Sequence, residues 1–561
     1  MTAPRPQSGA AVAAVALGCC WLLAGVWLRY YQLDLQILVE DEWHAIHKIL
    51  QSGFAGIFTS FGRSDYSIPL ALYDRLLMEH GGLTEWTMRM PMFIAGTALL
   101  AAAPLLVRRG ADGWTRALWV GLLAVSPLLV YFSKIARPYS ITVLAAFVAV
   151  IAVRRWWRGD GAGWAVAYLA GTWAAAWLHP VTLGFTLLPL AYFGAAAMRA
   201  ALQGDRHPLL RLAAIAAALI ALLAATLGPP LYHDWDAMAG KVGEHAMSAA
   251  SVYRTGLMLA GTGSPAVLAA LAALTGYGAI VLWRRDRELL RFFALPILGY
   301  WLLLAASRAT WIEHPLVQAR YLLVVLPFLL FATATGAVAA ARAAPWRLAA
   351  PVAVAALPLA LLALGPLPRS FYYPNQFLGH ERFQYDYDEA KNPYVTLAPK
   401  QKMPAFYDEL ARLPPASVTL IEAPWSLESQ FNPLPFYQQR HRQRIKIGMV
   451  TGVCGERSFG EYPESARGLR MRHLVHLSAL LRGKRYGADY LVVHRTPWTI
   501  APGVLPTQWP DVERCLPKIS ARFGTPVFSD DQIVVFALSS KAAPSRSFPT
   551  QPGARTSGPA H

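Results

Sequence analysis

Residues 212–229 read LAAIAAALIALLAATLGP, a stretch without a charged side chain. At about 1.5 Å of rise per residue, a helix of roughly 20 such residues crosses the ~30 Å hydrocarbon core of a bilayer. The whole chain has the same character: of its 561 residues, 55% are hydrophobic and 15% are charged. Soluble domains carry about 25% charged residues. The sequence therefore predicts a membrane protein.

The same apolar pattern recurs along the chain and predicts eleven membrane spans. They are expected at residues 9–28, 87–107, 116–132, 138–153, 162–178, 181–198, 212–229, 265–283, 292–307, 320–341 and 347–364. An odd number of spans places the two ends of the chain on opposite sides of the membrane.

Basic residues outnumber acidic ones, 51 to 33, which gives a formal net charge of +18. Such an excess is typical of nucleic-acid-binding proteins and of membrane proteins with basic cytoplasmic loops. In this chain the Arg residues gather in alternate short connections between spans: Arg108, Arg109, Arg116; Arg154, Arg155, Arg158; Arg199, Arg206, Arg211; Arg284, Arg285, Arg287, Arg291; Arg342 and Arg347. The distribution predicts a multi-pass protein of the plasma or inner membrane with a cytoplasmic N-terminus, and argues against a nucleic-acid partner.

After the last span the composition becomes polar and mixed. Short apolar runs alternate there with helix-like stretches, a pattern typical of a compact α/β domain. The predicted strands are 417–421, 445–450, 490–494 and 533–538, and the predicted helices 403–413, 477–486 and 511–523. The predicted fold class is an α-helical polytopic membrane protein with a C-terminal extracytoplasmic α/β domain. We expect a membrane module over 1–364, with a long first external loop at 29–86, the α/β domain over 365–540, and a disordered tail over 541–561.

The four cysteines divide by compartment. Cys19 and Cys20 lie in the first span and are expected to be small core residues. Cys454 and Cys515 both fall in the exported domain, where an oxidising environment permits a bridge. We predict that they pair, the alternative being two separate free thiols. The segment Ala16–Cys19 is similar to a lipoprotein cleavage site, but the apolar run continues past it, so we expect the first helix to be retained.

Three consecutive acids, Glu40, Asp41 and Glu42, follow the first span. Adjacent carboxylates repel one another, so such a run is costly unless it meets a cation, a metal or a reacting proton. The alternative is a solvated helix N-terminus, where acids complement the helix dipole. If a helix begins at Glu40, then Glu40, His44 and His47 share one face and are candidate ligands of a divalent metal such as Mg²⁺ or Mn²⁺. Two histidines at a headgroup boundary are the alternative.

Cations also occur on the predicted outer side, against the positive-inside bias. Lys134 and Arg137 lie between the third and fourth spans, and Arg308 and Arg320 lie on either side of the loop before the tenth. A phosphate at the membrane surface would account for them. Arg side chains that extend to the interface without a ligand are the alternative.

Three short motifs resemble those of a known family of membrane enzymes. Asp41-Glu42 in the first external loop, Ala136-Arg137-Pro138-Tyr139 at the start of the fourth span, and Arg320-Tyr321 followed by Pro327 resemble the GT-C membrane glycosyltransferases. The pattern is similar to the branch of protein O-mannosyltransferases and lipid A aminoarabinose transferases and covers roughly residues 10–340. Supporting segments are Asp65–Leu70, Arg89-Met90-Pro91 and Leu178-His179-Pro180.

The resemblance implies an inverting transfer of a sugar from a polyprenyl-phosphate donor to an extracytoplasmic glycolipid, glycan or protein. It implies Asp41 as general base, with Glu42 orienting the acceptor or sharing the proton. The residues expected at the donor phosphate and lipid are Lys134, Arg137, Tyr139, His179, Arg308, Arg320 and Tyr321. Many relatives carry an acid before the Ala-Arg-Pro-Tyr turn, where this chain has Ile135. The acid is then expected from Asp65, or from Asp234 and Asp236. Together with Glu40 these residues form the expected acceptor or auxiliary set. Several members of this class use a divalent metal at the equivalent loop and others do not.

A transporter or lipid flippase is the alternative from another class. Transport sites usually place charged groups near the middle of the bilayer, in repeated halves with broken helices. The predicted spans are almost free of interior charges, the acids lie at one face, and the sequence shows no convincing internal repeat. The sequence therefore favours the transferase.

Overall fold

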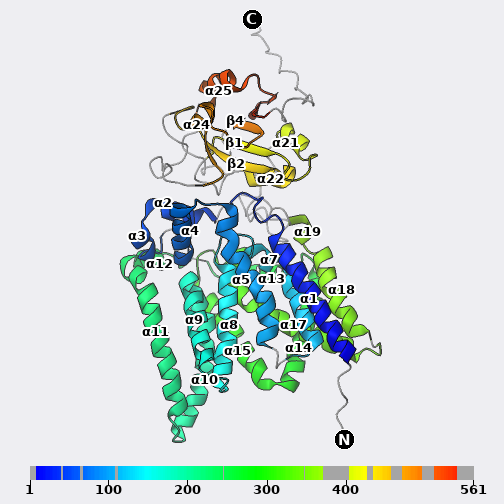
Figure 1. Cartoon of the computed structure of the whole chain (residues 1–561). Helices are drawn as coiled ribbons and strands as arrows, with labels where there is room; N and C mark the ends of the chain where they lie inside the picture. Colours follow the sequence, from blue (N-terminus) through cyan, green and yellow to red (C-terminus); the bar gives the residue numbers. More distant parts are fainter. Residues whose placement is uncertain are drawn as a thin grey trace.

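The computed structural model shows a bundle of long helices with a small sheet domain at one end (Figure 1). It describes residues 8–38, 42–62, 67–107, 111–243, 245–346, 348–370, 403–425, 434–455, 471–495 and 511–539. The predicted tail at 541–561 lies outside this part of the chain.

Each predicted span coincides with a helix or with a run of consecutive helices. Eight helical segments are long and apolar enough to cross a membrane by length and composition, and Gly113–Val125 and Ala349–Leu364 are shorter apolar helices. The bundle consists of α1 (Ser8–Tyr30), α5 (Glu85–Leu106), α6 (Gly113–Val125), α7 (Pro127–Phe132), α8 (Tyr139–Trp157), α9 (Gly163–Leu178), η2 (Pro180–Thr182), α10 (Leu183–Leu202), α11 (His207–His233), α14 (Pro265–Arg285), α15 (Arg287–Ser307), α16 (Pro315–Leu322), η3 (Leu323–Val325), α17 (Leu326–Ala343) and α18 (Ala349–Leu364). The predicted helical membrane fold is confirmed.

One predicted span, 116–132, is interrupted. The residue before a proline is disfavoured in the helical conformation, and Ser126 before Pro127 is extended, with ψ 116°. The segment therefore forms two helices, α6 and α7. A second correction concerns Cys19 and Cys20, which are exposed rather than in the core, because α1 lies at the rim of the bundle (Figure 1).

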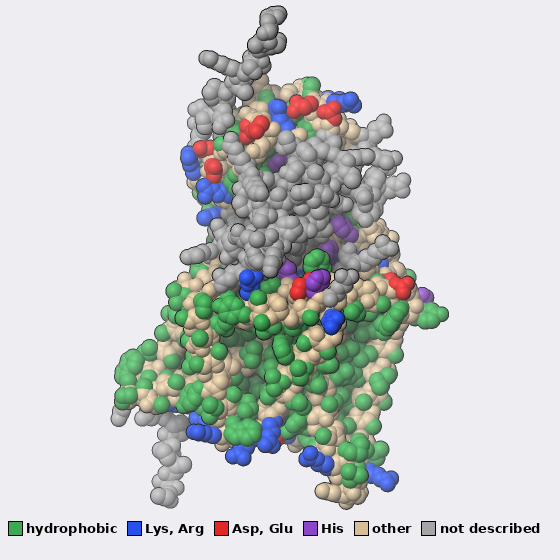
Figure 2. All heavy atoms as spheres, turned by 180° about the vertical axis from the view of Figure 1, so that it is seen from behind, with side chains coloured by type: hydrophobic (Ala, Val, Ile, Leu, Met, Phe, Trp, Pro, Cys, Tyr) green, Lys and Arg blue, Asp and Glu red, His purple; other side chains and the backbone are tan. Residues whose placement is uncertain are grey.

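The outside of the bundle carries the charge pattern that the sequence predicted. Figure 2 shows a band of hydrophobic side chains around the helices, with Lys and Arg along the edge away from the sheet domain. Ion pairs join loops at that edge: Arg154 with Asp286 at 3.3 Å, Arg158 with Glu288 at 2.8 Å and Arg342 with Asp112 at 2.8 Å.

Short helices lie on the opposite edge, under the sheet domain. In the first external loop they are α2 (Trp43–Gln51), α3 (Phe54–Phe58) and α4 (Ile68–His80), and later ones are α12 (Trp235–Ala239), α13 (Ala249–Ala260) and α19 (Leu367–Ser370). Helices α2 to α4 form a layer between the bundle and the sheet (Figure 1).

The C-terminal region folds around a mixed sheet of order β3-β2-β1-β4-β6-β5. Strands β3, β2, β1 and β4 are parallel, and β6 runs antiparallel to both β4 and β5. The strands are β1 (Thr419–Ala423), β2 (Arg444–Met449), β3 (Leu474–His476), β4 (Tyr490–His494), β5 (Phe528–Ser529) and β6 (Ile533–Ala537), with α21 (Ala405–Leu410), α22 (Leu434–His441), α24 (Leu477–Leu481), η7 (Val512–Arg514) and α25 (Leu516–Phe523) packed around them. The predicted α/β class is confirmed. Cys454 and Cys515 are joined by the predicted disulfide, with a Cα–Cα distance of 4.7 Å.

The sheet domain contacts the first external loop directly. The Ile37 backbone N–H donates to the Gln438 side chain at 2.9 Å, and the ring centroids of Trp43 and Trp425 lie 4.5 Å apart. One hydrophobic cluster contains residues of α2, α4 and α5 together with residues of the sheet. The loop that holds the predicted base is therefore packed beneath the sheet domain.

Candidate functional site

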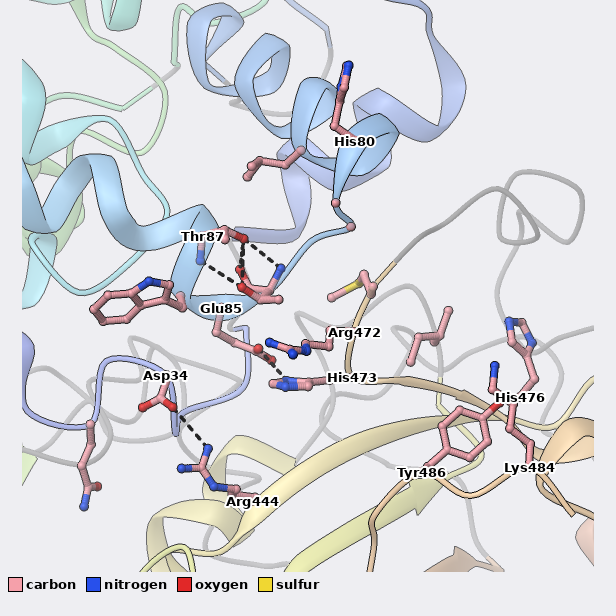
Figure 3. A pocket seen from close by; sticks show the side chains of 18 of the residues that line it. Asp34, His80, Glu85, Thr87, Arg444, Arg472, His473, His476, Lys484 and Tyr486 are labelled. Atoms are coloured by element: carbon pink, nitrogen blue, oxygen red, sulfur yellow. Dashed lines mark hydrogen bonds and ion pairs between the residues drawn. The ribbon is translucent and has the colours of Figure 1, made fainter.

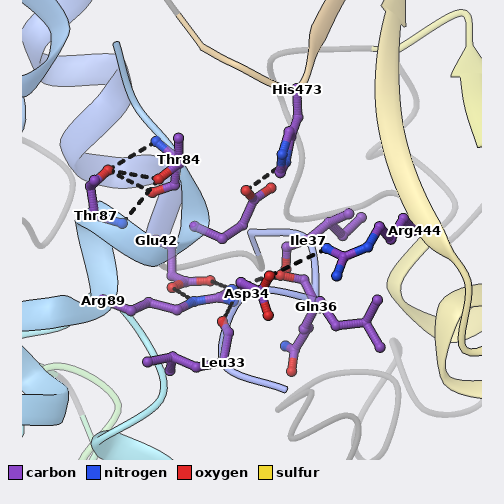
Figure 4. Close-up of polar contacts among 12 residues, drawn as sticks. Leu33, Asp34, Gln36, Ile37, Glu42, Thr84, Thr87, Arg89, Arg444 and His473 are labelled. Carbon is purple, nitrogen blue, oxygen red and sulfur yellow. Dashed lines mark hydrogen bonds and ion pairs between the residues drawn. The ribbon is translucent and has the colours of Figure 1, made fainter. Parts of the chain in front are cut away.

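Glu42, in the first external loop, forms a buried ion pair with Arg89 (Figure 4). The Arg89 guanidinium on α5 donates to both oxygens of the Glu42 carboxylate, at 2.8 and 2.7 Å. Glu42 is fully buried and Arg89 is 1% exposed. A bidentate pair of this kind combines charge with fixed geometry.

The Glu42–Arg89 pair joins three segments that are distant in sequence. Arg89 also donates to the backbone carbonyls of Leu33, Gln36 and Ile37 at 2.8 to 3.1 Å. The Glu42 carboxylate accepts the backbone N–H of Ala136 at 2.6 Å. The first loop, α5 and the turn before α8 are thus held together around one carboxylate. The geometry gives Glu42 a holding role, because both of its oxygens are occupied inside the protein.

A second acid, Asp74 on α4, lies buried close to this pair. Burial and the nearby Glu42 carboxylate raise the pKa of Asp74 well above its usual range. Asp74 could not be recognised from sequence, because a lone acid on a short helix carries no signal without its neighbours.

Five of the residues expected at the donor phosphate meet at the same end of the bundle. The ring of Tyr139 lies 5.7 Å from that of His179, which lies 5.6 Å from that of Tyr321. The Arg137 and Arg320 guanidinium carbons lie 5.9 and 5.8 Å from the centre of the Tyr139 ring. We call these five residues the Tyr139 cluster.

The elements explain why the Tyr139 cluster forms. Arg137 lies in the turn before α8 and Tyr139 is the first residue of that helix. His179 links α9 to η2, and Arg320 and Tyr321 are near the end of α16. All three places are helix ends. Arg137 is 5% exposed, and Ala136 beside it binds Glu42, so the cluster adjoins the buried ion pair. Two guanidinium groups over one ring create a positive, partly dehydrated site that attracts an anion.

His314 lies in the loop before α16, close enough to Arg320 for the guanidinium charge to affect its pKa. Burial and the neighbouring Arg320 lower the pKa of His314 to about 4. The imidazole is therefore neutral at pH 7.

Lys134 and Arg308 are the other two cations expected at the donor phosphate. Lys134 donates to the Tyr31 carbonyl at 2.8 Å, and burial together with the Arg89 charge lowers its pKa to about 7. Arg308 ends α15 in a left-handed conformation, φ 45°, and its side chain is exposed. The Arg308 carbonyl accepts the Gly243 N–H.

Asp234, one of the auxiliary acids, binds the first external loop. It accepts hydrogen bonds from the Ser60 hydroxyl at 2.7 Å and the Gly62 N–H at 2.8 Å. Partial burial would raise the pKa of Asp234, but these bonds and the Lys48 charge outweigh it and lower the pKa. Asp236 is exposed on α12.

Glu40, Asp41 and Asp65 lie outside the described residues, so their roles stay predictions. Helix α2 begins at Trp43, with His44 and His47 half-buried on it. Within the part of the chain that the structure describes, no group of three His, Cys, Asp or Glu residues is placed to hold a metal. The predicted set of Glu40, His44 and His47 depends on a residue beyond that part.

Arg89 appears in the sequence only as part of the supporting segment Arg89-Met90-Pro91. The signal that could have marked it is an Arg near the outer end of a predicted span, the third residue of 87–107. The partner could not be read from spacing, because Glu42 lies 47 residues earlier.

Fold and site together define a multi-pass membrane protein with a basic, aromatic-lined cluster at one end of its bundle, on the same side as a small sheet domain.

No protein-family model matches the sequence, and neither does any curated protein. Among solved structures the chain is similar to ArnT from Cupriavidus metallidurans in the apo state, at 15% identity and TM-score 0.43, over 96% of this chain and 99% of that one. ArnT from the same organism bound to undecaprenyl phosphate gives 14% and 0.42, over 96% and 100%. The Archaeoglobus fulgidus oligosaccharyltransferase in complex with Zn and sulfate gives 12% and 0.36, over 85% and 68%.

Because each of these three TM-scores is below 0.5, the reaction is inferred from the residues of this chain.

Proposed function

We propose that the protein transfers a sugar from a polyprenyl-phosphate donor to an acceptor on the side of the sheet domain. The Tyr139 cluster is the observation that carries this proposal. Arg137 and Arg320 lie over one ring at the end of the apolar bundle, where the phosphate of a membrane-embedded donor would lie.

The chemistry of the donor requires such a site. Breaking a glycosyl–phosphate bond passes through an oxocarbenium-like state, as in glycoside hydrolysis. The departing polyprenyl phosphate gains negative charge, which fixed cations in a partly dehydrated site stabilise. The oxygen of the leaving phosphate keeps the electron pair of the broken bond. Arg137 and Arg320 are proposed to receive that charge, with Tyr139, His179 and Tyr321 shaping the site.

The acceptor must lose a proton as it attacks, so a carboxylate is required nearby. We propose Asp41 as that base. Glu42 follows Asp41 directly and is held by Arg89 and by the Ala136 N–H, which belongs to the same turn as Arg137. Glu42 is thereby proposed to position the base relative to the phosphate site.

A divalent metal is not part of this proposal. His44 and His47 are the described residues that the sequence offered as ligands, and the described residues around them complete no three-ligand group. We derive no step through a metal.

The orientation follows from the arginine-rich edge of the bundle. We propose that this edge is cytoplasmic and that the sheet domain, over about 365–540, lies outside. A reporter that works only outside the cytoplasm, fused after Leu367, is expected to be active. An inactive reporter would indicate the opposite orientation of the protein.

The test is a transfer assay with purified protein, labelled polyprenyl-phosphate monosaccharides and membrane acceptors. General-base catalysis contributes about 10²–10⁴-fold, so Asp41→Asn is expected to lower kcat by at least ~100-fold. Arg137→Gln and Arg320→Gln are expected to lower kcat/KM for the donor. The control is Glu79→Gln, in an exposed pair with Arg75 on α4, which is expected to react like wild type.

Two outcomes would contradict the assignments. Wild-type turnover by Asp41→Asn would contradict the assignment of Asp41 as the base. Wild-type kcat/KM in both arginine variants would contradict the assignment of Arg137 and Arg320 to the phosphate site.

A further inference from the structure

A large cavity lies between the start of α5 and the sheet domain (Figure 3). Its volume is about 1200 Å³, whereas small-molecule pockets usually measure roughly 300–1,000 Å³. The segment 31–38 separates it from the ion pair of Glu42 and Arg89: Gln32 and Asp34 line the cavity, while Leu33 and Gln36 bind Arg89. The cavity is therefore distinct from the Tyr139 cluster.

Both acids that line the cavity are occupied by bases of the sheet domain. Asp34 pairs with Arg444 at 3.3 Å, and Glu85 pairs with His473 at 2.6 Å. The two carboxylates of the lining are set against three Lys and Arg side chains, Arg444, Arg472 and Lys484. The lining therefore carries net positive charge even when its histidines are neutral.

Further cations are present on the sheet-domain wall. Arg472 and Lys484 line the cavity together with His476, and among the described residues neither of these two cations forms an ion pair with a carboxylate. Figure 3 shows His476, Lys484 and Tyr486 at one end of the cavity, Asp34 and Arg444 at the other, and Arg472 between them.

The cations on this wall also repel one another. Burial and the Lys484 charge lower the pKa of His476. Burial and the Arg472 charge lower the pKa of Lys446, which donates to the Tyr486 carbonyl behind the wall. Like charges held together in this way are stabilised when an anion lies between them.

The other wall of the cavity reaches the membrane boundary. Tyr30 is the last residue of α1 and Trp86 the second of α5, and both line the cavity. Their rings lie 5.8 Å apart, and Phe93 on α5 packs against both. Tyr30 is 54% exposed. Aromatic residues at the ends of spans are typical of the headgroup level of a bilayer.

We propose that this cavity binds the phosphate-bearing headgroup of a membrane lipid. Arg472 contacts the phosphate, Lys484 adds positive charge further along the same wall, and Tyr30 and Trp86 lie beside the start of the acyl chains. A free phosphate compound shares the charge but would make no use of the aromatic wall, so the geometry favours a lipid. The site requires no sugar transfer and goes beyond the proposed reaction.

The experiment uses the purified full-length protein and a fluorescent short-chain phosphatidic acid as the probe. Binding is measured by fluorescence anisotropy for wild type, for R472Q/K484Q and for the control R482Q/R485Q. Both variants lose two positive charges from exposed positions, but Arg482 and Arg485 do not line the cavity. The expected result is a Kd raised by roughly tenfold or more in R472Q/K484Q, with the control close to wild type.

Competition separates the sources of the anion. Unlabelled phosphatidic acid is expected to displace the probe at far lower concentration than phosphatidylcholine or inorganic phosphate. Equal weakening in both double variants would overturn the site, because surface charge alone would then explain binding. Displacement by inorganic phosphate as readily as by phosphatidic acid would overturn the assignment to a lipid.

Discussion

At the scale of single residues, two neighbouring acids of one motif have different surroundings. Glu42 is buried against Arg89 and the Ala136 N–H, so its carboxylate is occupied by the protein itself. Asp41, proposed as the base, precedes it directly. The sequence predicted that the acids matter, because a run of carboxylates is costly without partners. It could not predict which acid is structural, because the partner of Glu42 lies on another helix.

Arg89 is expected to act on stability as well as on activity. Lys cannot reproduce the fork that serves both Glu42 and three carbonyls, so Arg89→Lys should lower the melting temperature and the kcat of transfer. Breaking a buried pair costs about 3–5 kcal/mol. The matched control is Arg412→Lys in the exposed pair with Glu409, where about 1 kcal/mol or less is at stake. Equal melting temperatures for both variants would contradict the holding role.

His441 gives the sheet domain a pH-dependent stability. Its ring is fully buried, stacks on Tyr407 at 5.3 Å, and accepts the Gln443 N–H at 2.9 Å. Burial lowers the pKa of His441 to about 3, below the ~6.5 of an unfolded chain. The unfolded state therefore binds the extra proton, and stability that is complete above pH 6.5 falls as the pH drops towards 3.

The variant His441→Asn keeps an acceptor for Gln443 and removes the titration. Between pH 6.5 and 4.5, wild type should lose about 2–3 kcal/mol more stability than the variant. Thermal melts at several pH values measure this difference. Parallel pH curves for the two proteins would show that His441 does not titrate in this range.

At the scale of elements, the helices were predictable because crossing a bilayer requires a long apolar segment. The contacts between the helices were not predictable, because an apolar helix surface does not indicate which other helix it packs against. Helices α14 and α17 meet at Gly278 and Gly336, where an added Cβ would overlap the backbone of the facing helix. Strands β3 and β5, of three and two residues, were missed because such short runs show no alternation.

The glycine contact makes a sharp prediction. Gly278→Ala places a methyl group against the Ala332 carbonyl, and the two helices must separate, which costs about 1–3 kcal/mol or more. We expect a clear fall in melting temperature. Gly276→Ala on the same helix is the control, because its Cβ would point into open space. Equal melting temperatures would mean that α14 and α17 adjust without cost.

At the scale of the whole molecule, the sequence predicted two parts but not how they meet. The bond between Ile37 and Gln438 joins residues 401 positions apart, and no local pattern marks either of them. The first external loop, which the sequence predicts only as a long loop between two spans, folds into α2 to α4 and supports the sheet domain. The cavity beside it exists only because the two parts are docked, so no motif could have indicated it.

The central claim is that the protein breaks a sugar–phosphate bond at the Tyr139 cluster. The most direct measurement follows a doubly labelled polyprenyl-phosphate sugar with purified protein in sealed vesicles. The account predicts that free polyprenyl phosphate appears in equal amount to sugar on the acceptor, and that Arg137→Gln slows both together. Movement of the intact donor across the bilayer, with no free polyprenyl phosphate, would contradict the account and identify a transporter.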